Sequence, residues 1–121
     1  MAIQKILVVD DSETDRTYLT EMLEKAGFTV ATAESGEECL TKVEVDTPDL
    51  VLMDILMPGL NGFQTTRALS KNPKTENIPV IVCTGKESAT DRMWAIRQGA
   101  KECVIKPVQA EELLAKIQSL G

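Results

Sequence analysis

Three aspartates, one threonine and one lysine stand directly after short apolar runs, and their side chains could carry out phosphoryl chemistry. These residues are Asp10, Asp11, Asp54, Thr84 and Lys106. A carboxylate can attack a phosphoryl group to form an acyl phosphate when the negative charge of the incoming group is stabilised. Phosphoryl transfer needs mainly positioning and electrostatic stabilisation of the oxygens, which a metal ion, an ammonium and a hydroxyl can supply. The set is sufficient for transfer to an aspartate if the fold brings its members together.

The charges of this set predict a divalent cation. Two carboxylates about 4 Å apart repel each other by about 4 kcal/mol at an effective dielectric constant of 20. Three carboxylates and one ammonium leave two uncompensated negative charges, which Mg²⁺ would neutralise with the oxygen ligands that it prefers. Without such an ion, the pKa of at least one carboxylate should rise. Asp10, Asp11 and Asp54 are therefore the candidate metal site.

The elements that must position these residues can be predicted from the alternation of apolar runs and amphipathic stretches. The runs cover residues 3–9, 28–33, 50–53, 78–83 and 103–105. Several are apolar throughout, which is typical of parallel strands covered on both faces. Five strand–helix units predict an α/β three-layer sandwich with right-handed crossovers. Ligands of such sheets bind beyond the carboxyl ends of the strands, where the five residues should meet.

Apolar spacing and capping residues predict the helices between the strands. Three stretches place apolar side chains on one face: Leu19, Met22, Leu23 and Ala26; Ala89, Met93, Ile96 and Ala100; and Ala110, Leu113, Leu114 and Ile117. Ser12, with Asp15 three residues later, and Ser35, with Glu38, can cap the first two helices because their hydroxyls accept from free amides.

Length and charge exclude several classes of protein. With 121 residues, the chain is expected to be a single domain over 1–121 with no attached output domain. Acidic residues outnumber Lys and Arg by 19 to 13, which argues against nucleic acid binding. No apolar run approaches the roughly 20 residues of a membrane span and the first turn carries no signal-peptide pattern, so we expect a cytoplasmic protein without membrane insertion. Cys39, Cys83 and Cys103 have apolar neighbours and are expected to be buried and reduced.

The chemistry-bearing residues lie within a longer pattern that resembles response-regulator receiver domains of two-component systems. The pattern comprises Val8-Val9-Asp10-Asp11-Ser12, the segment 52–62 that contains Asp54 and Met57-Pro58, then Thr84-Gly85, Gly99-Ala100 and Lys106-Pro107. The resemblance covers essentially the whole chain in the right order. It implies a CheY-like, flavodoxin-like fold with five parallel strands in the order 2-1-3-4-5. Residues 91–94 and 97–100 also resemble the twitching-motility regulators within this family.

The resemblance implies roles for the acidic residues. Asp54 is similar to the phosphoacceptor, and Asp11 is similar to the direct ligand of Mg²⁺. Asp10 would hold metal-bound water, and the backbone carbonyl of Leu56 would complete the protein ligands. Leu56 and Lys86 also occupy positions that line the path of attacking water, and we expect apolar Leu56 to shield the acyl phosphate.

Five further positions follow from the same resemblance. Thr84 is similar to the switch hydroxyl that bonds a phosphoryl oxygen, and Lys106 would pair with the acyl phosphate. The bond from Lys106 to Pro107 is expected to be cis. Gly85 replaces the commoner alanine and is expected to keep the phosphate entrance open, since a larger side chain would crowd it. Cys103 stands where many receivers have an aromatic ring, so either the switch works differently or this is a simple packing substitution.

The partners implied are a histidine kinase and, after phosphorylation, a downstream target protein. The resemblance implies a stand-alone regulator that is not an enzyme beyond its own phosphoryl transfer and autodephosphorylation, and we expect a monomer. Its target would bind near Trp94, Cys103 and Val108. Trp94 lies beside the predicted core face of its helix, so it could equally flank the core or anchor a partner.

Other functions fit the sequence less well. A phosphatase of the haloacid-dehalogenase class needs a second aspartate two residues after its nucleophile on the first strand, but Ser12 and Glu13 follow Asp10 and Asp11 at that spacing. A flavin-binding module needs a hydroxyl- and glycine-rich first loop, whereas this loop is acidic. Two alternatives within the family remain open: a phosphate sink for a shared kinase, and an interaction module that works without phosphorylation.

Overall fold

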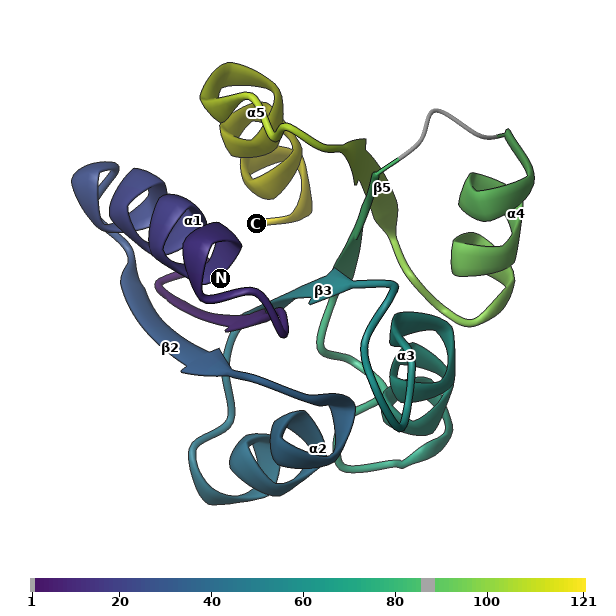
Figure 1. Cartoon of the computed structure of the whole chain (residues 1–121). Coiled ribbons are helices and arrows are strands. Elements are labelled where there is room, and N and C mark those ends of the chain that lie inside the picture. Colours follow the sequence, from purple (N-terminus) through teal and green to yellow (C-terminus); the bar gives the residue numbers. More distant parts are fainter. Residues whose placement is uncertain (1, 86–88) are drawn as a thin grey trace.

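The chain folds into a five-stranded parallel sheet with helices on both faces (Figure 1). The structure is a computed structural model that describes residues 2–85 and 89–121. Within these residues the strands are β1 (Lys5–Val9), β2 (Thr29–Ala33), β3 (Leu50–Asp54), β4 (Val80–Thr84) and β5 (Glu102–Ile105). The helices are α1 (Glu13–Lys25), α2 (Gly36–Val45), α3 (Gly62–Lys71), α4 (Ala89–Arg97) and α5 (Ala110–Leu120). The strand order β2-β1-β3-β4-β5 confirms the predicted topology.

The helices divide between the two faces of the sheet, which confirms the three-layer sandwich. Helices α1 and α5 cover one face, and α2, α3 and α4 cover the other (Figure 1). The central strands β3 and β4 are buried along their whole length because helices cover both of their faces. This arrangement explains why their sequences are apolar at consecutive positions rather than at alternate ones.

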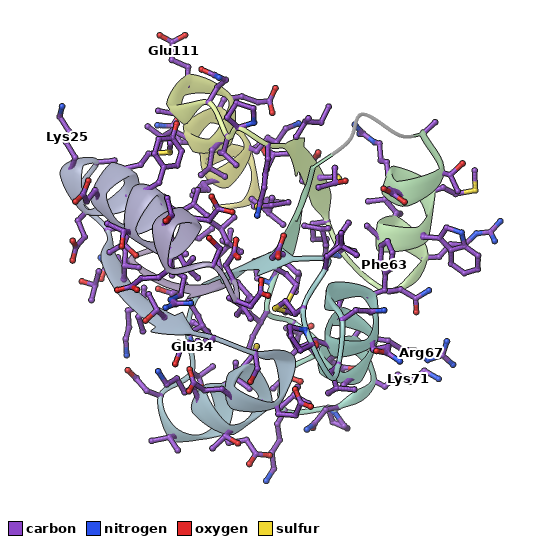
Figure 2. All side chains as sticks on the ribbon, in the orientation of Figure 1. Lys25, Glu34, Phe63, Arg67, Lys71 and Glu111 are labelled. Atoms are coloured by element: carbon purple, nitrogen blue, oxygen red, sulfur yellow. The ribbon has the colours of Figure 1, made fainter. Side chains whose placement is uncertain are left out.

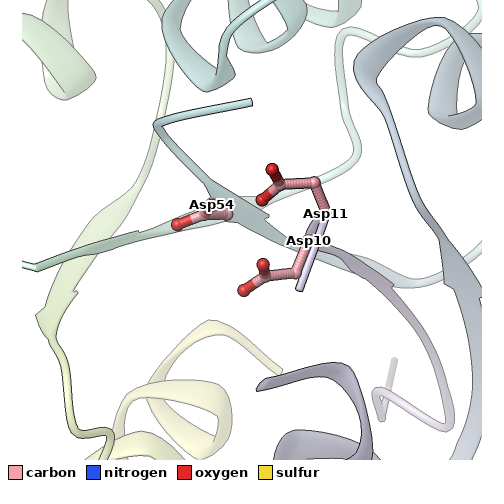
Figure 3. Close-up of side chains that lie close together, drawn as sticks. All are labelled: Asp10, Asp11 and Asp54. Atoms are coloured by element: carbon pink, nitrogen blue, oxygen red, sulfur yellow. The ribbon is translucent and has the colours of Figure 1, made fainter. Parts of the chain in front are cut away.

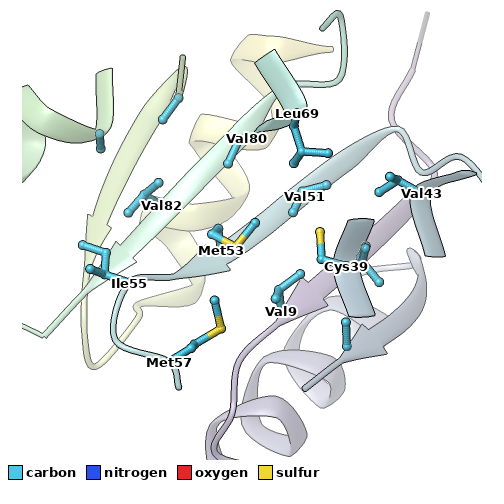
Figure 4. Close-up of a cluster of buried hydrophobic side chains, with 14 of the residues drawn as sticks. Val9, Cys39, Val43, Val51, Met53, Ile55, Met57, Leu69, Val80 and Val82 are labelled. Atoms are coloured by element: carbon cyan, nitrogen blue, oxygen red, sulfur yellow. The ribbon is translucent and has the colours of Figure 1, made fainter. Parts of the chain in front are cut away.

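Two hydrophobic cores lie on opposite faces of the sheet, since successive strand side chains point to opposite sides. Val9, Met53 and Val82 face α2 and α3, where they pack with Cys39 and Leu69 (Figure 4). The alternate strand residues face α1 and α5: Ile6, Val8, Leu50, Leu52, Ile81, Cys83 and Val104. Burying one leucine, valine or methionine stabilises the fold by about 1.5–3 kcal/mol. These two cores fix the strand ends relative to one another.

Side-chain caps begin the first three helices. Ser12 accepts a hydrogen bond from the Asp15 amide at 3.3 Å, and Ser35 accepts one from the Glu38 amide at 3.0 Å, which confirms both predicted caps. Helix α3 begins with a reciprocal capping box, in which the side chains of Asn61 and Gln64 each accept from the backbone amide of the other at 2.9 Å.

The predicted core face of α4 is wrong. That face comprised Ala89, Met93, Ile96 and Ala100, of which Ala100 is buried. Met93 and Ile96 are 52% and 44% exposed, whereas Ala95 is fully buried against the sheet. The helix is rotated so that its inner side carries half-buried Asp91 and, one turn later, Ala95. A small residue at the centre of the contact lets the helix pack closely on the sheet, and the larger apolar side chains are left at the surface.

The burial of the cysteines and the charged surface of the molecule agree with what the sequence predicts. Cys39, Cys83 and Cys103 are free and buried, and burial raises the pKa of Cys39 and of Cys83 to about 12, so both thiols stay protonated at neutral pH. Charged side chains such as Lys25, Lys71 and Glu111 project outward from the helices (Figure 2). Among residues 2–85 and 89–121, no helix combines the length and the apolar character needed to cross a membrane.

Candidate functional site

The register of the sheet places the predicted residues along one edge. Val9 pairs with Met53 between β1 and β3, so Asp10 and Asp54 follow at neighbouring positions. Thr84 ends β4 and pairs with Ile105 of β5, so Lys106 follows beside it. Because β1, β3, β4 and β5 are consecutive in the sheet, their carboxyl ends form one row. The structure brings together the residues that the sequence singled out.

The three carboxylates of this edge point to the same side (Figure 3). One oxygen each of Asp10, Asp11 and Asp54 can be chosen so that all three lie within 4.8 Å of one another. Asp10 is 1% exposed and Asp54 is 9% exposed, whereas Asp11 lies at the surface. Two buried carboxylates with an exposed third form a group that is open to ions from one side.

This oxygen set fits Mg²⁺. The ligands are hard carboxylate oxygens, and their charge is not balanced by the nearby lysine. Mg²⁺ holds its ligands at about 2.0–2.1 Å, so oxygens on opposite sides of the ion are about 4 Å apart, close to the 4.8 Å limit found here. Exposed Asp11 leaves the ion room for the waters that Mg²⁺ usually retains.

Lys106 holds the acidic groups together. Its Nζ lies 2.9 Å from Asp10 Oδ2, 3.0 Å from Asp54 Oδ1 and 2.9 Å from Asp15 Oδ2. Burial opposes the charged form of this ammonium, but the hydrogen bonds to Asp10, Asp15 and Asp54 outweigh burial and raise the pKa of Lys106. The lysine is therefore charged at any physiological pH. Its peptide bond to Pro107 is cis, the geometry that the sequence resemblance implies.

The environment of Asp54 disfavours its charge. Burial raises the pKa of the Asp54 carboxyl above its usual value, and the negative charges of Asp10 and Asp11 act in the same direction. The hydrogen bond from Lys106 acts against these effects without cancelling them. This result agrees with the expectation that a carboxylate pKa rises in the absence of a cation. The protein alone therefore does not fully compensate the charge of Asp54.

A cavity of about 500 Å³ opens beside Asp54. Its lining comprises Asp54, Ile55, Leu56, Phe63, Thr84, Gly85, Asp91 and Lys106. At the margin of the cavity, the Leu56 side chain is 81% exposed. Phe63, at the start of α3, also lines the cavity (Figure 2). Lys86, expected on the water path, lies outside the described residues. The cavity is large enough for a phosphoryl group in contact with Asp54, Thr84 and Lys106.

Gly85 lines the cavity beside Asp54, at the entrance where the sequence resemblance places it. In the described part of the chain, a β-carbon added at Gly85 would meet nothing within 4 Å. The space at this position is open, so a side chain there would project into it, and the role of Gly85 in keeping the phosphate entrance clear stays a prediction.

Sequence reasoning missed two carboxylates at the site. Asp15 was interpreted only as part of a helix start, yet it contacts Lys106. Asp91 accepts a long hydrogen bond of 3.4 Å from the Thr84 hydroxyl and lines the cavity. The spacing of Asp91 and Ala95 was the available signal, since a helix that buries Ala95 turns the residue one turn earlier toward the strand ends.

The three residues near which a partner is expected to bind differ in exposure. Trp94 is 48% exposed, with the Arg97 guanidinium 5.7 Å from the centre of its ring. Cys103 is buried in the core on the α2–α4 face. Val108 is only 3% exposed because its side chain packs into the core beneath α1 and α5. Of the three, Trp94 alone presents its side chain to solvent.

The fold and the site match a known family. Residues 6–118 match the response regulator receiver domain. The chain belongs to the response regulator receiver family. Over 116 residues, 96% of both chains, the receiver is 50% identical to protein PilH of Pseudomonas aeruginosa, which confirms the narrower resemblance. It is 36% identical to the response regulator PleD of Caulobacter vibrioides, of which it spans 26%.

Solved structures agree with this assignment. The receiver superposes on the chemotaxis protein CheY4 of Vibrio cholerae with a TM-score of 0.91 at 30% identity, covering 99% of this chain and 100% of that one. A putative response regulator from Chloroflexus aurantiacus gives a TM-score of 0.94 at 28% identity, covering 98% and 97% of the two chains. Receivers generally act in signalling rather than as enzymes, bind Mg²⁺ through acidic residues and work with a histidine kinase and an effector.

Proposed function

We propose that this receiver accepts a phosphoryl group on Asp54 from the phosphohistidine of a histidine kinase. The observation that carries the proposal is the position of Asp54. It is buried at the end of β3 beside two further aspartates, 3.0 Å from an ammonium and next to a cavity that also contains Thr84. A carboxylate oxygen of Asp54 bonds to phosphorus as the bond to the imidazole nitrogen breaks, and the imidazole leaves with the electron pair.

The surrounding side chains would stabilise the transferring group. Lys106 would donate to one phosphoryl oxygen, and the Thr84 hydroxyl, which now bonds Asp91, would turn to another. Asp11 and Asp54 would hold Mg²⁺ directly with the Leu56 carbonyl, and Asp10 would hold its bound water. The ion would neutralise negative charge on the phosphoryl oxygens. Lys106, fixed by Asp10, keeps one positive charge at the site throughout.

Asp91 offers a route from phosphorylation to α4. Movement of the Thr84 hydroxyl toward the phosphoryl group breaks its hydrogen bond to Asp91, which lies in the first turn of α4. The new negative charge would also repel the Asp91 carboxylate across the shared cavity. This route requires no aromatic ring at Cys103. The face that includes exposed Trp94 would then change its affinity for a downstream target.

In this proposal the receiver acts as a monomeric, stand-alone domain over 1–121 in the cytoplasm, without binding nucleic acid. It signals through a noncovalent protein contact in type IV pilus motility, also called twitching motility, or in chemotaxis. Its similarity to PilH supports the first pathway. A phosphate sink for a shared kinase would use the same chemistry without a downstream target. A phosphorylation-independent interaction module would not need Asp54.

Labelling by a small phosphodonor tests the proposal. The wild-type receiver is incubated with the donor and Mg²⁺, and its intact mass is measured. We expect one phosphoryl group per chain, lost in Asp54→Ala and retained in Asp46→Ala, which removes an exposed aspartate remote from the site. Equal labelling of wild type and Asp54→Ala would show that Asp54 is not the acceptor.

A further inference from the structure

Asp15 makes a contact that its position in α1 does not explain. It is the third residue of a helix capped by Ser12, where an acidic side chain commonly reaches back to the amide of the capping residue. Here the Ser12 amide donates instead to Asp10 Oδ1 at 2.9 Å. Asp15 is therefore released from the capping role that Gln64 performs in α3, and its carboxylate turns to Lys106.

The contact completes the hydrogen bonding of Lys106. An ammonium has three protons to donate. Three carboxylates surround Lys106 Nζ at 2.9, 2.9 and 3.0 Å, contributed by Asp10, Asp15 and Asp54. A phosphoryl oxygen on Asp54 can accept from this lysine only when one of these contacts is given up. Of the two partners other than Asp54, Asp10 is buried and also held by the Ser12 amide, whereas Asp15 is 43% exposed, so Asp15 is the more easily released.

Asp15 contacts Lys106 from the side away from the proposed phosphoryl site. The cavity beside Asp54 is lined by Lys106 but not by Asp15. A second cavity of about 300 Å³, between α1 and the segment that follows β5, is lined by both of them. Tyr18, one turn along α1, donates to the Val108 carbonyl at 2.7 Å and fixes α1 against this segment. The Asp15 contact thus opposes displacement of the ammonium toward the phosphoryl site.

We infer that Asp15 is a positioning residue that competes with the phosphoryl group on Asp54 for Lys106. In the unphosphorylated receiver, the Asp15 carboxylate holds the ammonium toward α1. Movement of the ammonium onto a phosphoryl oxygen stretches that contact, so the negative charge of Asp15 lowers the affinity of the site for a phosphoryl group. The inference rests on the proposed function of Asp54 and adds a residue that sets how strongly the phosphorylated state is favoured.

Binding of a phosphoryl mimic tests the inference. The receiver, residues 1–121, is titrated with beryllofluoride in the presence of Mg²⁺, and the bound species is measured by fluorine NMR. Asp15→Asn removes the competing charge and is expected to lower the dissociation constant about two- to fivefold, the size typical of a partly exposed ion pair. The difference between the variant and wild type should shrink at high ionic strength, because salt screens exposed charges.

Two matched variants separate this role from a structural one. Glu13→Gln removes an equal charge from the same first turn of α1 and should leave the affinity unchanged. Asp15→Glu keeps the charge and should restore wild-type affinity. A variant that merely loosened α1 would bind beryllofluoride more weakly. An unchanged or weaker affinity of Asp15→Asn, or equal tightening in Glu13→Gln, would overturn the inference.

The same titration separates failure of the inference from failure of the proposed function. If wild type does not bind beryllofluoride, or if Asp54→Ala binds it equally well, the proposed role of Asp54 is wrong and the inference falls with it. If wild type binds through Asp54 and Asp15→Asn matches wild type, only the role of Asp15 is wrong.

Discussion

Replacing Asp54 by asparagine should stabilise the receiver in the absence of divalent cations. Asp54 is buried, and its carboxyl pKa is raised by burial and by Asp10 and Asp11. Asparagine has nearly the same shape without the charge. Lys106 would keep its contacts with Asp10 and Asp15, so the substitution leaves no buried charge without a partner.

The distances give the expected magnitude. The carboxylate oxygens lie within 4.8 Å of one another, and at that upper limit and an effective dielectric constant of 20 two carboxylates repel by about 3.5 kcal/mol. Asp54 has two such neighbours and one attraction to Lys106, which at 3.0 Å contributes about 5.5 kcal/mol. Repulsion therefore exceeds attraction by about 1.5 kcal/mol. Because Asp11 is exposed, its repulsion of Asp54 is weaker than this figure, whereas burial of Asp54 makes the charge of the Asp54 carboxylate more costly. We expect Asp54→Asn to stabilise the fold by about 1–2 kcal/mol, or roughly 4–8 °C in Tm.

Thermal unfolding in EDTA and in Mg²⁺ measures this effect. Mg²⁺ should raise the Tm of wild type more than that of Asp54→Asn, because the ion compensates the charge that the variant lacks. The exposed Glu44→Gln on α2 serves as the charge-matched control and should change neither value. If Asp54→Asn is no more stable than wild type in EDTA, the electrostatic account of the site is refuted.

The contribution of Asp54 to the stability of the fold should become less favourable as pH rises. A carboxyl whose pKa is higher in the folded than in the unfolded state binds its proton more tightly when folded. Asp54 therefore lowers stability progressively as pH rises from its unfolded pKa, near the ordinary value of 3.8, through its raised folded pKa. The advantage of Asp54→Asn should be full above the raised folded pKa of Asp54 and vanish at acidic pH, where Asp54 is protonated in both states. An advantage that persists unchanged at acidic pH would contradict the charge argument.

Three further predictions concern other residues. Leu56→Asn should accelerate dephosphorylation of the acyl phosphate, because Leu56 at the cavity margin would no longer shield it from water; an unchanged rate would exclude this role. Asp91→Ala should tighten beryllofluoride binding about two- to threefold, since the Thr84 hydroxyl loses a competing acceptor; unchanged affinity would exclude the coupling. Asp49→Ala should destabilise the fold by about 1 kcal/mol at pH 7, because the Asp49 carboxylate accepts hydrogen bonds from the backbone amides of Gln4 and Lys5. These hydrogen bonds also lower the pKa of Asp49. That difference should disappear as pH falls through the lowered pKa of Asp49, and a constant difference in chemical denaturation would refute the assignment.

The sheet and the acidic edge could be predicted because they depend on local signals. Apolar runs without alternation indicate strands covered on both faces, and four of the five runs are followed directly by a residue with chemical function. Once the strands are parallel, Asp10, Asp54, Thr84 and Lys106 must lie on one edge, whatever the details of packing. The register confirms this inference.

What could not be predicted depends on contacts between distant parts of the chain. Asp15 has the spacing of a capping residue, and only the hydrogen bond from Ser12 to Asp10 reveals that its carboxylate is available to Lys106. The rotation of α4 also depends on packing, because Ala95 is less hydrophobic than Met93 and a periodicity argument favours the larger residue. In both cases steric fit and competition for donors, rather than composition, decided the outcome.

The central claim is that Asp54 is the residue that carries the phosphoryl group. After labelling with a small phosphodonor, the acyl phosphate can be reduced with borohydride, which converts the modified aspartate to homoserine, and the site identified by tandem mass spectrometry. We predict modification at Asp54 in the presence of Mg²⁺ and loss of modification in EDTA. Modification at Asp10, Asp11 or any other residue in place of Asp54 would contradict the account.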